Sequence, residues 1–250
     1  MPWAAARDLG VYLRSGQLAM MVAGPGVGKS VVAMSYAIQS GCRTLYLSMD
    51  TDAFTTSIRL ISAVTGMTLA DAEQKLELQD PEILDLLCEM DELKFAFTSS
   101  PDEREIGERL LAYIEAEGEA PELLVVDNLA NVAVDDSDEF GALRRLIRDM
   151  QTIAGQVGCG VLVLHHATGE FDNGVDPVPM KGINGKLSKF PALILTGHRP
   201  SPGTVRWDVV KHRFGPADPS ASTKHFTLGV DMERVQIGPD PAPLTWASER

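Results

Sequence analysis

Residues 23–30 read Ala-Gly-Pro-Gly-Val-Gly-Lys-Ser, which is the Walker A pattern with alanine in place of its first glycine. Phosphate binding needs backbone N–H groups that wrap round the anion, and only a glycine-rich turn brings them close enough. In this pattern Lys29 reaches the β- and γ-phosphates, and the Ser30 hydroxyl is a ligand for Mg²⁺. The motif therefore predicts a site for magnesium-bound ATP, made by the residues Gly24, Pro25, Gly26, Val27, Gly28, Lys29, Ser30 and Val31.

Hydrolysis of a bound nucleotide also needs carboxylates, and two aspartates follow apolar runs that read as buried strands. Asp127 comes directly after Leu123–Val126, so we expect it beside the phosphate loop, where it holds the magnesium ion together with Ser30. The next residue, Asn128, stands where AAA+ proteins usually carry their catalytic glutamate, so a second carboxylate must come from elsewhere. Asp50, which ends another apolar run, is well placed for that role.

Each of these assignments has a structural alternative. A glycine-rich turn with a lysine can arise by chance, but here an apolar strand pattern precedes it and a helical pattern follows it, as a phosphate loop requires. Asp127 could be an ordinary residue at a strand end. Asp52 competes with Asp50 for the catalytic role, although Asp is also a preferred N-cap and Asp52 stands before a helical pattern.

The chain around these residues alternates between strand and helix patterns. Apolar runs predict strands at 18–23, 43–48, 93–97, 123–126 and 160–164, and helical periodicity predicts helices at 29–39, 52–64, 69–78, 81–91, 102–117 and 139–157. Strands that are apolar along their whole length are typical of a parallel sheet with helices on both faces. The predicted fold is therefore α/β, with a mostly parallel central sheet flanked by helices.

The last third of the chain has a different pattern. A long loop with Gly, Pro and Asp residues is predicted at 167–189, and loops of this length inside a domain are usually functional or disordered. Further strands are predicted at 192–196, 204–211, 224–228 and 234–237, and they form a C-terminal antiparallel extension of the sheet. We predict a single domain over residues 1–238 and a loose tail at 239–250.

Composition limits the class of protein. The net charge is −13, but residues 71–140 hold 22 of the 35 acidic and only 4 of the 22 basic residues, so the remainder is net positive by 5. A nucleic-acid surface outside the acidic stretch is therefore not excluded. The three cysteines form no CxxC pair and are typical of buried thiols in a reducing compartment. With no membrane span or signal peptide in the pattern, we expect a soluble, cytoplasmic protein.

These motifs, in this order, resemble the C-terminal ATPase domain of DnaB-type replicative helicases and the shorter RepA-type plasmid helicases. The likeness runs from about Leu18 to Gly215 and is carried by Leu18–Ser30, Leu47–Asp50 with Ile58–Leu60, Val125–Leu129, Val161–His166, Leu193–Arg199 and Lys211–Pro216. The second and last of these are the specific ones, because the phosphate loop and the strand before Asp127 occur in P-loop proteins generally. The resemblance implies a RecA-like P-loop NTPase fold that hydrolyses ATP with Mg²⁺.

The resemblance also implies roles for residues at two strand ends. In RecA-type proteins a glutamate after the second strand positions the attacking water, and here that residue is Asp50, one methylene shorter. These proteins place a polar sensor of the γ-phosphate after the strand that here ends in His165 and His166. One imidazole can point toward the nucleotide while the other points away, and we assign the sensor to His165. The alternative is that both are surface side chains on a loop.

Two cations near the end of the resemblance could act on phosphate. Residues two apart on a strand share a face, so Lys211 and Arg213 point together while His212 points away. Two such cations could stabilise the charge on a transferring phosphoryl group. In the helicase family the pair acts on ATP bound to the neighbouring subunit, so the resemblance implies self-association into a ring, a hexamer, with each site completed in trans. The alternative is a solvated pair on an edge strand.

The helicase family contacts single-stranded DNA through loops that line the central hole of the ring. The matching segments are 130–138 and 168–189. The first carries three aspartates, which would repel a phosphate backbone, so we expect DNA contact on the second. Phosphate contact there is predicted for Lys181, Asn184, Lys186 and Lys189, which lie among glycines.

Three functions remain open at this point. The first is a ring-shaped ATP-driven helicase that translocates on single-stranded DNA, with a loader or primase protein as a further partner. The second is a recombinase-like or mediator ATPase that forms filaments on DNA and unwinds nothing. The third, from a different class, is an ATP-gated switch that binds a protein partner through the acidic surface of residues 71–140.

Overall fold

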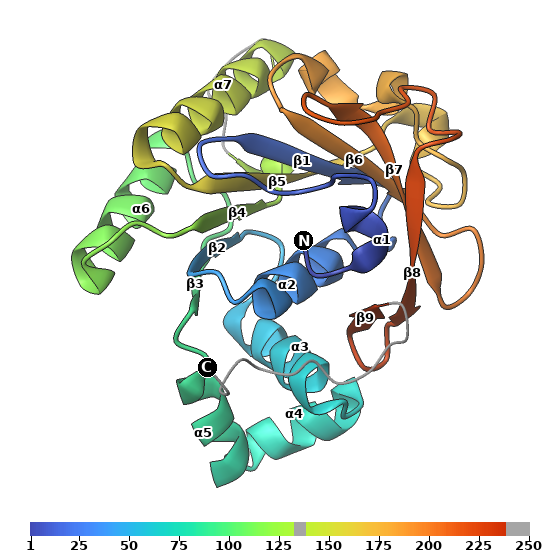
Figure 1. Ribbon diagram of the computed structural model, residues 1–250. Helices are drawn as coiled ribbons and strands as arrows, with labels where there is room; N and C mark the ends of the chain where they lie inside the picture. The colour runs from blue at the N-terminus through green and yellow to red at the C-terminus, as the bar shows by residue number, and fades with distance from the viewer. Residues whose placement is uncertain (133–138, 239–250) are drawn as a thin grey trace.

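The chain is organised round one mixed β-sheet (Figure 1). The computed structural model describes residues 1–132 and 139–238, except for the side chains of 139, 140 and 184–186. Its strands are β1 (Leu18–Ala23), β2 (Thr44–Ser48), β3 (Leu93–Phe97), β4 (Leu123–Asp127), β5 (Gly160–His166), β6 (Leu193–His198), β7 (Thr204–His212), β8 (His225–Asp231) and β9 (Gln236–Gly238). The order across the sheet is β3-β2-β4-β5-β1-β6-β7-β8-β9, parallel from β3 to β6 and antiparallel from β6 to β9. The predicted parallel sheet with an antiparallel C-terminal extension is confirmed.

The helices cover both faces of this sheet. They are α1 (Ala4–Arg7), α2 (Lys29–Ser40), α3 (Ala53–Thr65), α4 (Leu69–Glu77), α5 (Pro81–Glu89), α6 (Glu103–Glu117) and α7 (Glu139–Val157). One hydrophobic cluster joins α1, α2 and α3 to one face, and a second joins α6 and α7 to the other (Figure 1). A third, smaller cluster packs α4 and α5 against α3, below the sheet in the figure.

The central strands are apolar throughout because both of their faces are buried. Every residue of β1 is buried, and alternate residues belong to opposite clusters: Ala19, Met21 and Ala23 to the one under α2, and Leu18, Met20 and Val22 to the other. This alternation follows from the period of two in a β-strand. It also decides which side of the sheet each polar residue at a strand end will face.

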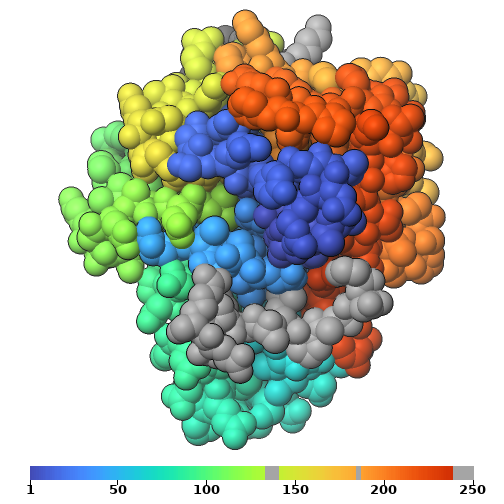
Figure 2. Space-filling model, in the orientation of Figure 1, coloured from blue at the N-terminus to red at the C-terminus, as the bar shows by residue number. Residues whose placement is uncertain are grey.

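The N-terminal segment packs against the other end of the chain. The short helix α1, which the sequence did not predict, contacts β8. Trp3, Ala6 and Val11 from this segment are buried in the same cluster as α2. In Figure 2 the blue N-terminal surface accordingly lies beside the orange and red C-terminal surface. The antiparallel extension is thus covered on this face by residues from the start of the chain.

The predicted long loop after β5 contains ordered turns. It holds three short 3-10 helices, η2 (Gly169–Phe171), η3 (Met180–Gly182) and η4 (Asn184–Lys189). Val178, Ile183 and Leu187 anchor it by entering the cluster with α7. An isolated antiparallel bridge joins Ala167 to Ile183, so the two ends of the intervening segment are held together.

The last strand, β9, begins two residues later than predicted. The reason is a turn in which the Asp231 carboxylate accepts the N–H groups of Glu233 and Arg234. Among the described residues no single helix is both long and apolar enough to cross a membrane. The pair α3 and α4 meets the length and composition only when taken together, and it is bent by 118°.

Candidate nucleotide site

The phosphate loop connects the end of β1 to the start of α2. Gly26 and Gly28 have backbone φ angles of 71° and 105°. Residues that carry a side chain rarely adopt such angles, so the turn depends on glycine at both positions. Helix α2 begins at Lys29, directly after the loop. The free N–H groups of its first turn and the positive end of its dipole therefore face the loop, as an anion site requires.

The segment after β5 packs closely on this loop. A Cβ atom at Gly24 would clash with the carbonyl oxygen of Asp172, so glycine is required there by a close backbone approach. At Gly174 a Cβ would lie 3.0 Å from a methyl group of Val27. Residues 172–174 thus form one wall of the phosphate loop and tie it to the segment in which DNA contacts were predicted.

The Lys29 side chain is buried at the base of the loop. Its Nζ donates to the carbonyl oxygens of Ala23, at 2.9 Å, and Gly24, at 3.1 Å, and lies 3.5 Å from Nδ1 of His166. Burial lowers the pKa of Lys29, and the charges of Asp127 and Asp50 partly oppose that effect. The ammonium group is therefore held where an anionic group would favour its charged form.

Asp127 ends β4 beside the start of α2 and is held by the hydroxyl of Tyr46. The Tyr46 hydroxyl donates to Oδ2 of Asp127 at 2.7 Å, and Ser30 lines the same pocket as this carboxylate. Burial raises the pKa of Asp127, whereas the Tyr46 and Ser30 hydroxyls and the charge of Lys29 lower it. The structure therefore brings Lys29, Ser30 and Asp127 together, as the sequence predicted for their positions.

This donor set fits magnesium. A hydroxyl and a carboxylate are hard oxygen ligands, and Mg²⁺ is usually held by one or two carboxylates together with phosphates and waters. In the described part of the chain no three His, Cys, Asp or Glu side chains are grouped so that they could hold a metal by themselves. Ser30 and Asp127 thus suit an ion that arrives with the triphosphate.

Tyr46 was missed in the sequence. It is fully buried in the middle of β2, and burial, followed by the charge and hydrogen bond of Asp127, raises its pKa well above the usual value. A tyrosine inside a fully buried strand needs a partner for its hydroxyl. β2 pairs with β4, so that partner is Asp127 at the end of the neighbouring strand.

Asp50 lies beside Asp127 and faces the same site. Its two carboxylate oxygens accept hydrogen bonds from the side-chain amides of Asn128 and Asn131. Asp52 is instead the N-cap of α3, because its carboxylate accepts the N–H of Thr55 at 2.9 Å. Of the two aspartates that the sequence left as candidates, the structure therefore places Asp50 at the site.

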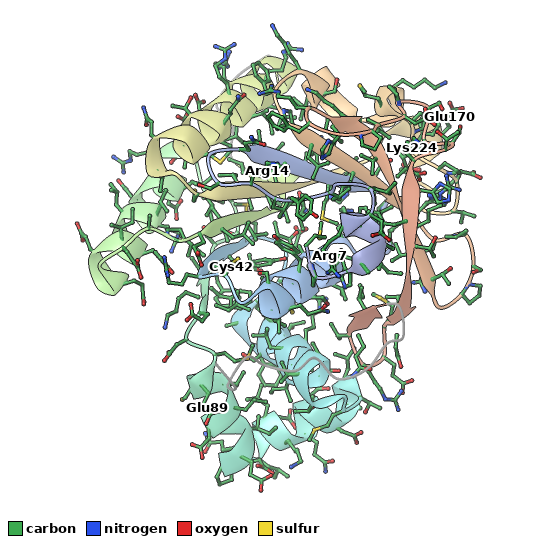
Figure 3. The ribbon with its side chains drawn as sticks, in the orientation of Figure 1. Arg7, Arg14, Cys42, Glu89, Glu170 and Lys224 are labelled. Carbon is green, nitrogen blue, oxygen red and sulfur yellow. The ribbon has the colours of Figure 1, made fainter. Side chains whose placement is uncertain are left out.

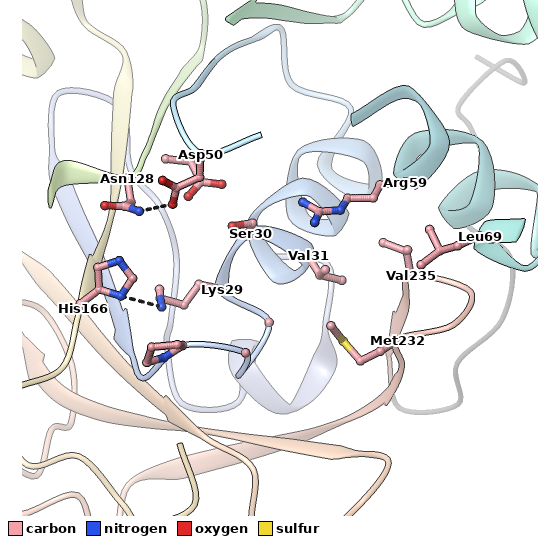
Figure 4. A pocket seen from close by; sticks show the side chains of 14 residues that line it. Lys29, Ser30, Val31, Asp50, Arg59, Leu69, Asn128, His166, Met232 and Val235 are labelled. Carbon is pink, nitrogen blue, oxygen red and sulfur yellow. Dashed lines mark hydrogen bonds between the residues drawn. The ribbon is translucent and has the colours of Figure 1, made fainter. Parts of the chain in front are cut away.

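Together these residues line a pocket of about 370 Å³ (Figure 4). Its lining consists of Pro25, Gly26, Gly28, Lys29, Ser30, Val31, Asp50, Arg59, Leu69, Asp127, Asn128, His166, Met232 and Val235. Figure 4 shows a polar end around Lys29 and Asp50 and a mainly apolar end at Leu69, Met232 and Val235. The apolar end joins the start of α4 to the turn between β8 and β9, residues far apart in sequence. No local signal in the chain identified them.

The assignment of the γ-phosphate sensor to His165 was wrong, because His166 is the histidine that faces the pocket. His165 is 1% exposed and does not line the pocket, whereas His166 does. The reason is the alternation along β5, in which Leu162 and Leu164 face α2 and His166 continues on that face. Burial and the nearby charge of Lys29 lower the pKa of His166, so its neutral form is favoured.

Alanine substitutions at the two histidines should therefore have different effects. His166→Ala is expected to lower ATP turnover about tenfold, the value of one hydrogen bond to a charged phosphate, with little change in melting temperature. His165→Ala leaves a cavity in the core and is expected to lower the melting temperature by about 5–10 °C. Turnover assays and thermal melts of both variants check this, and an unaffected turnover in His166→Ala would contradict it.

Lys211 and Arg213 lie away from this pocket. β7 runs antiparallel to β6, so its end at His212 pairs with Leu193, where β6 begins. The phosphate loop follows the opposite end of the adjacent β1, and a strand of this length spans roughly 17–20 Å. Neither cation lines the pocket, so within one chain they cannot reach a phosphate bound there.

Lys211 lies at the end of β7, and Arg213 lies in the bend that follows the strand. Nζ of Lys211 donates to the carbonyl oxygens of Ser188, at 2.6 Å, and Lys189, at 2.9 Å. Burial and then the charge of Arg213 lower the pKa of Lys211. Arg14, on the segment before β1 (Figure 3), stacks over Phe214 at 5.4 Å. Basic side chains thus gather at this edge of the sheet.

The predicted DNA-contact residues are only partly described. Lys181 lies over the ring of Phe171 at 5.4 Å, and Lys189 lies over the ring of Phe190 at 5.8 Å. Asn184 and Lys186 belong to η4, but their side chains lie outside the described residues. The predicted first loop, 130–138, is described only as far as residue 132, so its aspartates lie outside as well.

The sheet order, the phosphate loop after β1 and the aspartate that ends β4 define a RecA-type P-loop ATPase domain. The chain belongs to the AAA domain family, which it matches over residues 8–170. It is also similar to the gene 65 protein of Mycobacterium phage L5, with 39% identity over 227 residues that cover 87% of this chain and 84% of the phage protein.

Two solved structures have the same fold at low sequence identity. One is a DnaB-like replicative helicase studied with its interactions with primase, with a TM-score of 0.76 and 13% identity over 90% of this chain. This chain spans only 58% of that helicase chain. The other is the RadB recombinase, with a TM-score of 0.61 and 17% identity, where the match covers 94% of this chain and 96% of the recombinase. Both likenesses concern the fold.

Proposed function

We propose that the chain is an ATP-driven motor of the DnaB/RepA helicase type, which translocates on single-stranded DNA as a ring, a hexamer. The observation that carries this proposal is the position of Lys211 and Arg213, at the opposite end of the sheet from the phosphate loop of their own chain. Cations placed there can act on ATP only across a subunit boundary. A ring supplies such a boundary at every site.

In this proposal each residue of the pocket has one task. Lys29 and the first N–H groups of α2 hold the β- and γ-phosphates, and Ser30 and Asp127 would hold the magnesium ion. Bound magnesium would neutralise charge on the phosphate oxygens. Asp50 orients the attacking water, and His166, beside Lys29, contacts the γ-phosphate. Lys211 and Arg213 of the neighbouring subunit stabilise the charge of the transferring phosphoryl group.

The apolar end of the pocket suits the nucleobase. The Met232 sulfur would lie 3.6 Å from a Cβ at Gly28, so the turn between β8 and β9 sits directly beside the phosphate loop. Thioether and aliphatic side chains can pack against the apolar face of a base without hydrogen-bonding to its edge. We therefore assign Leu69, Met232 and Val235 to the base end of the site.

DNA is assigned to the segment after β5. Lys181 and Lys189 are described cations of that segment, and Asn184 and Lys186 complete the proposed set. Residues 172–174 of the same segment pack on the phosphate loop, so a movement of this segment would displace the loop. We propose that residues 1–238 act as one cytoplasmic domain and that a loader or primase protein is a further partner.

Single-stranded DNA is therefore expected to raise ATP turnover, by about fivefold or more. Turnover is measured with and without a long oligonucleotide at several salt concentrations, since phosphate contacts weaken steeply with salt. A protein with both Lys181→Ala and Lys189→Ala is expected to need several-fold more DNA for half-maximal stimulation. If DNA does not change the ATPase rate even at low salt, the proposed motor function is rejected and an ATP-gated protein-interaction switch is favoured.

A recombinase-like or mediator ATPase is the second candidate. The observation in its favour is the match to RadB, which covers nearly the whole length of both chains. Both candidates use sites completed between subunits, so assays of turnover do not separate them. Electron microscopy of the protein with ATP and single-stranded DNA does, because closed rings support the motor and helical filaments support the recombinase.

A further inference from the structure

The carboxylate of Asp50 is held by two amides from a single short segment. Nδ2 of Asn128 donates to one of its oxygens, and Nδ2 of Asn131 donates to the other. Both asparagines belong to the stretch that follows β4, at the start and end of η1 (Leu129–Asn131). Asp50 itself follows β2, so the two neighbouring strands β2 and β4 meet in this arrangement.

Further hydrogen bonds hold the side-chain amide of Asn128 and the backbone of Asn131. Asn128 is 1% exposed, and its Oδ1 accepts the N–H of Ala130 at 2.9 Å, which turns its NH₂ group toward Asp50. The backbone of Asn131 is fixed on both sides. Its N–H donates to the carbonyl oxygen of Asn128 at 3.1 Å, and its carbonyl oxygen accepts the Ser100 hydroxyl at 3.0 Å. The Asn131 amide is thus presented to Asp50 from a fixed position.

An aspartate without such partners would be poorly oriented. Rotation of a carboxylate about its last side-chain bond has a broad energy profile, and Asp50 is exposed to solvent on the side of the pocket. Two donors on different oxygens fix the plane of the group. Each oxygen has a second lone pair, so the carboxylate can still accept a hydrogen bond from water. A misplacement of about 1 Å in such a group can cost on the order of 100-fold in rate.

We infer that Asn131 is a positioning residue, which sets the orientation of Asp50 for ATP hydrolysis. This inference rests on the proposed function, in which Asp50 orients the attacking water. Asn128, which is buried, supplies the other amide, but its loss would also remove the hydrogen bond that its Oδ1 accepts from the N–H of Ala130. Asn131 is less buried than Asn128, so its amide can be changed with less effect on folding.

The test is a double-mutant cycle on turnover. Asn131→Ala and Asn131→Asp are each expected to lower kcat roughly tenfold with KM within about twofold, because the oriented step follows binding. Asn131→Asp keeps the shape of the side chain but loses the donor and adds a charge facing Asp50. In an Asp50→Asn background the same Asn131→Ala change is expected to lower kcat by less than about twofold, since its target has already been altered. Arg104→Ala, which changes an exposed side chain of α6 outside these contacts, is the control.

The outcomes separate this inference from the proposed function. Full turnover in Asn131→Ala, or an equal tenfold loss in the presence and absence of the Asp50 carboxylate, would overturn the positioning role alone. Full turnover in Asp50→Asn would overturn the proposed role of Asp50, and with it this inference. Melting curves of each variant show whether a loss of kcat reflects unfolding, and an Asn131→Ala protein that melts like the parent but turns over tenfold more slowly supports the inference.

Discussion

Arg213→Ala is expected to lower ATP turnover by about 1,000-fold, the effect of losing an arginine that stabilises a phosphoryl-transfer transition state. ATP affinity is expected to stay within about twofold, because Arg213 does not line the pocket of its own chain. Turnover is followed by phosphate release, and affinity by titration of a fluorescent ATP analogue. Arg104→Ala, which removes an exposed arginine of α6, is the control and should behave like the parent.

A mixing experiment tests the subunit boundary directly. Arg213→Ala and Lys29→Ala proteins are each expected to be inactive, but in mixed rings some sites combine an intact Lys29 with an intact Arg213 from the neighbour. With random mixing in equal amounts, about a quarter of the boundaries have this combination, so measurable turnover should return. No recovery in mixtures shown to exchange subunits would contradict completion of the site in trans, and so would full turnover in Arg213→Ala alone.

Lys29→Ala is expected to lose turnover to the level of background and to weaken ATP binding on the order of 100-fold, because it removes the cation that the phosphates contact. The fold should survive the change. Lys29 is buried and its pKa is lowered chiefly by burial, so its charge costs stability when no anion is bound. We therefore expect a melting temperature equal to or above that of the parent protein when both are measured without nucleotide.

Lys29→Met gives the matched comparison, since methionine keeps most of the side-chain length without the charge. It should melt like Lys29→Ala and be equally inactive. Added Mg·ATP should raise the melting temperature of the parent, because a ligand that binds only the folded state stabilises it. At the same concentration it should raise the melting temperatures of both variants much less, because they bind ATP more weakly. A Lys29→Ala protein that is stabilised by ATP as strongly as the parent would contradict the assignment of Lys29.

The sheet and its order along the chain could be predicted because the signals are local. Runs such as Leu123–Val126 are apolar throughout, as strands covered on both faces must be. A glycine-rich segment marks the turn from β1 to α2. The N-cap of α3 was also visible, since Asp52 stands directly before a helical pattern. In each of these cases neighbours in the sequence carry the physical cause.

The residues that were missed depend on contacts between distant segments. Tyr46 matters because β2 pairs with β4, and Met232 because the turn after β8 folds back onto α2. His165 was chosen over His166 because a strand pattern shows alternation but does not show which face lies toward the phosphate loop. Asn131 gains its role only when the end of η1 meets Asp50 across 81 residues of sequence. Such facts require the three-dimensional pairing.

The site depends on the meeting of Lys29, Ser30 and Asp127, and a crystal structure with Mg²⁺ and a non-hydrolysable ATP analogue tests it most directly. The account predicts the metal within about 2.1 Å of the Ser30 hydroxyl oxygen, with Asp127 bound to it directly or through a water. The β- and γ-phosphates should contact Lys29 and the first N–H groups of α2. A nucleotide bound outside the loop of residues 23–30, or a metal remote from both Ser30 and Asp127, would contradict the account.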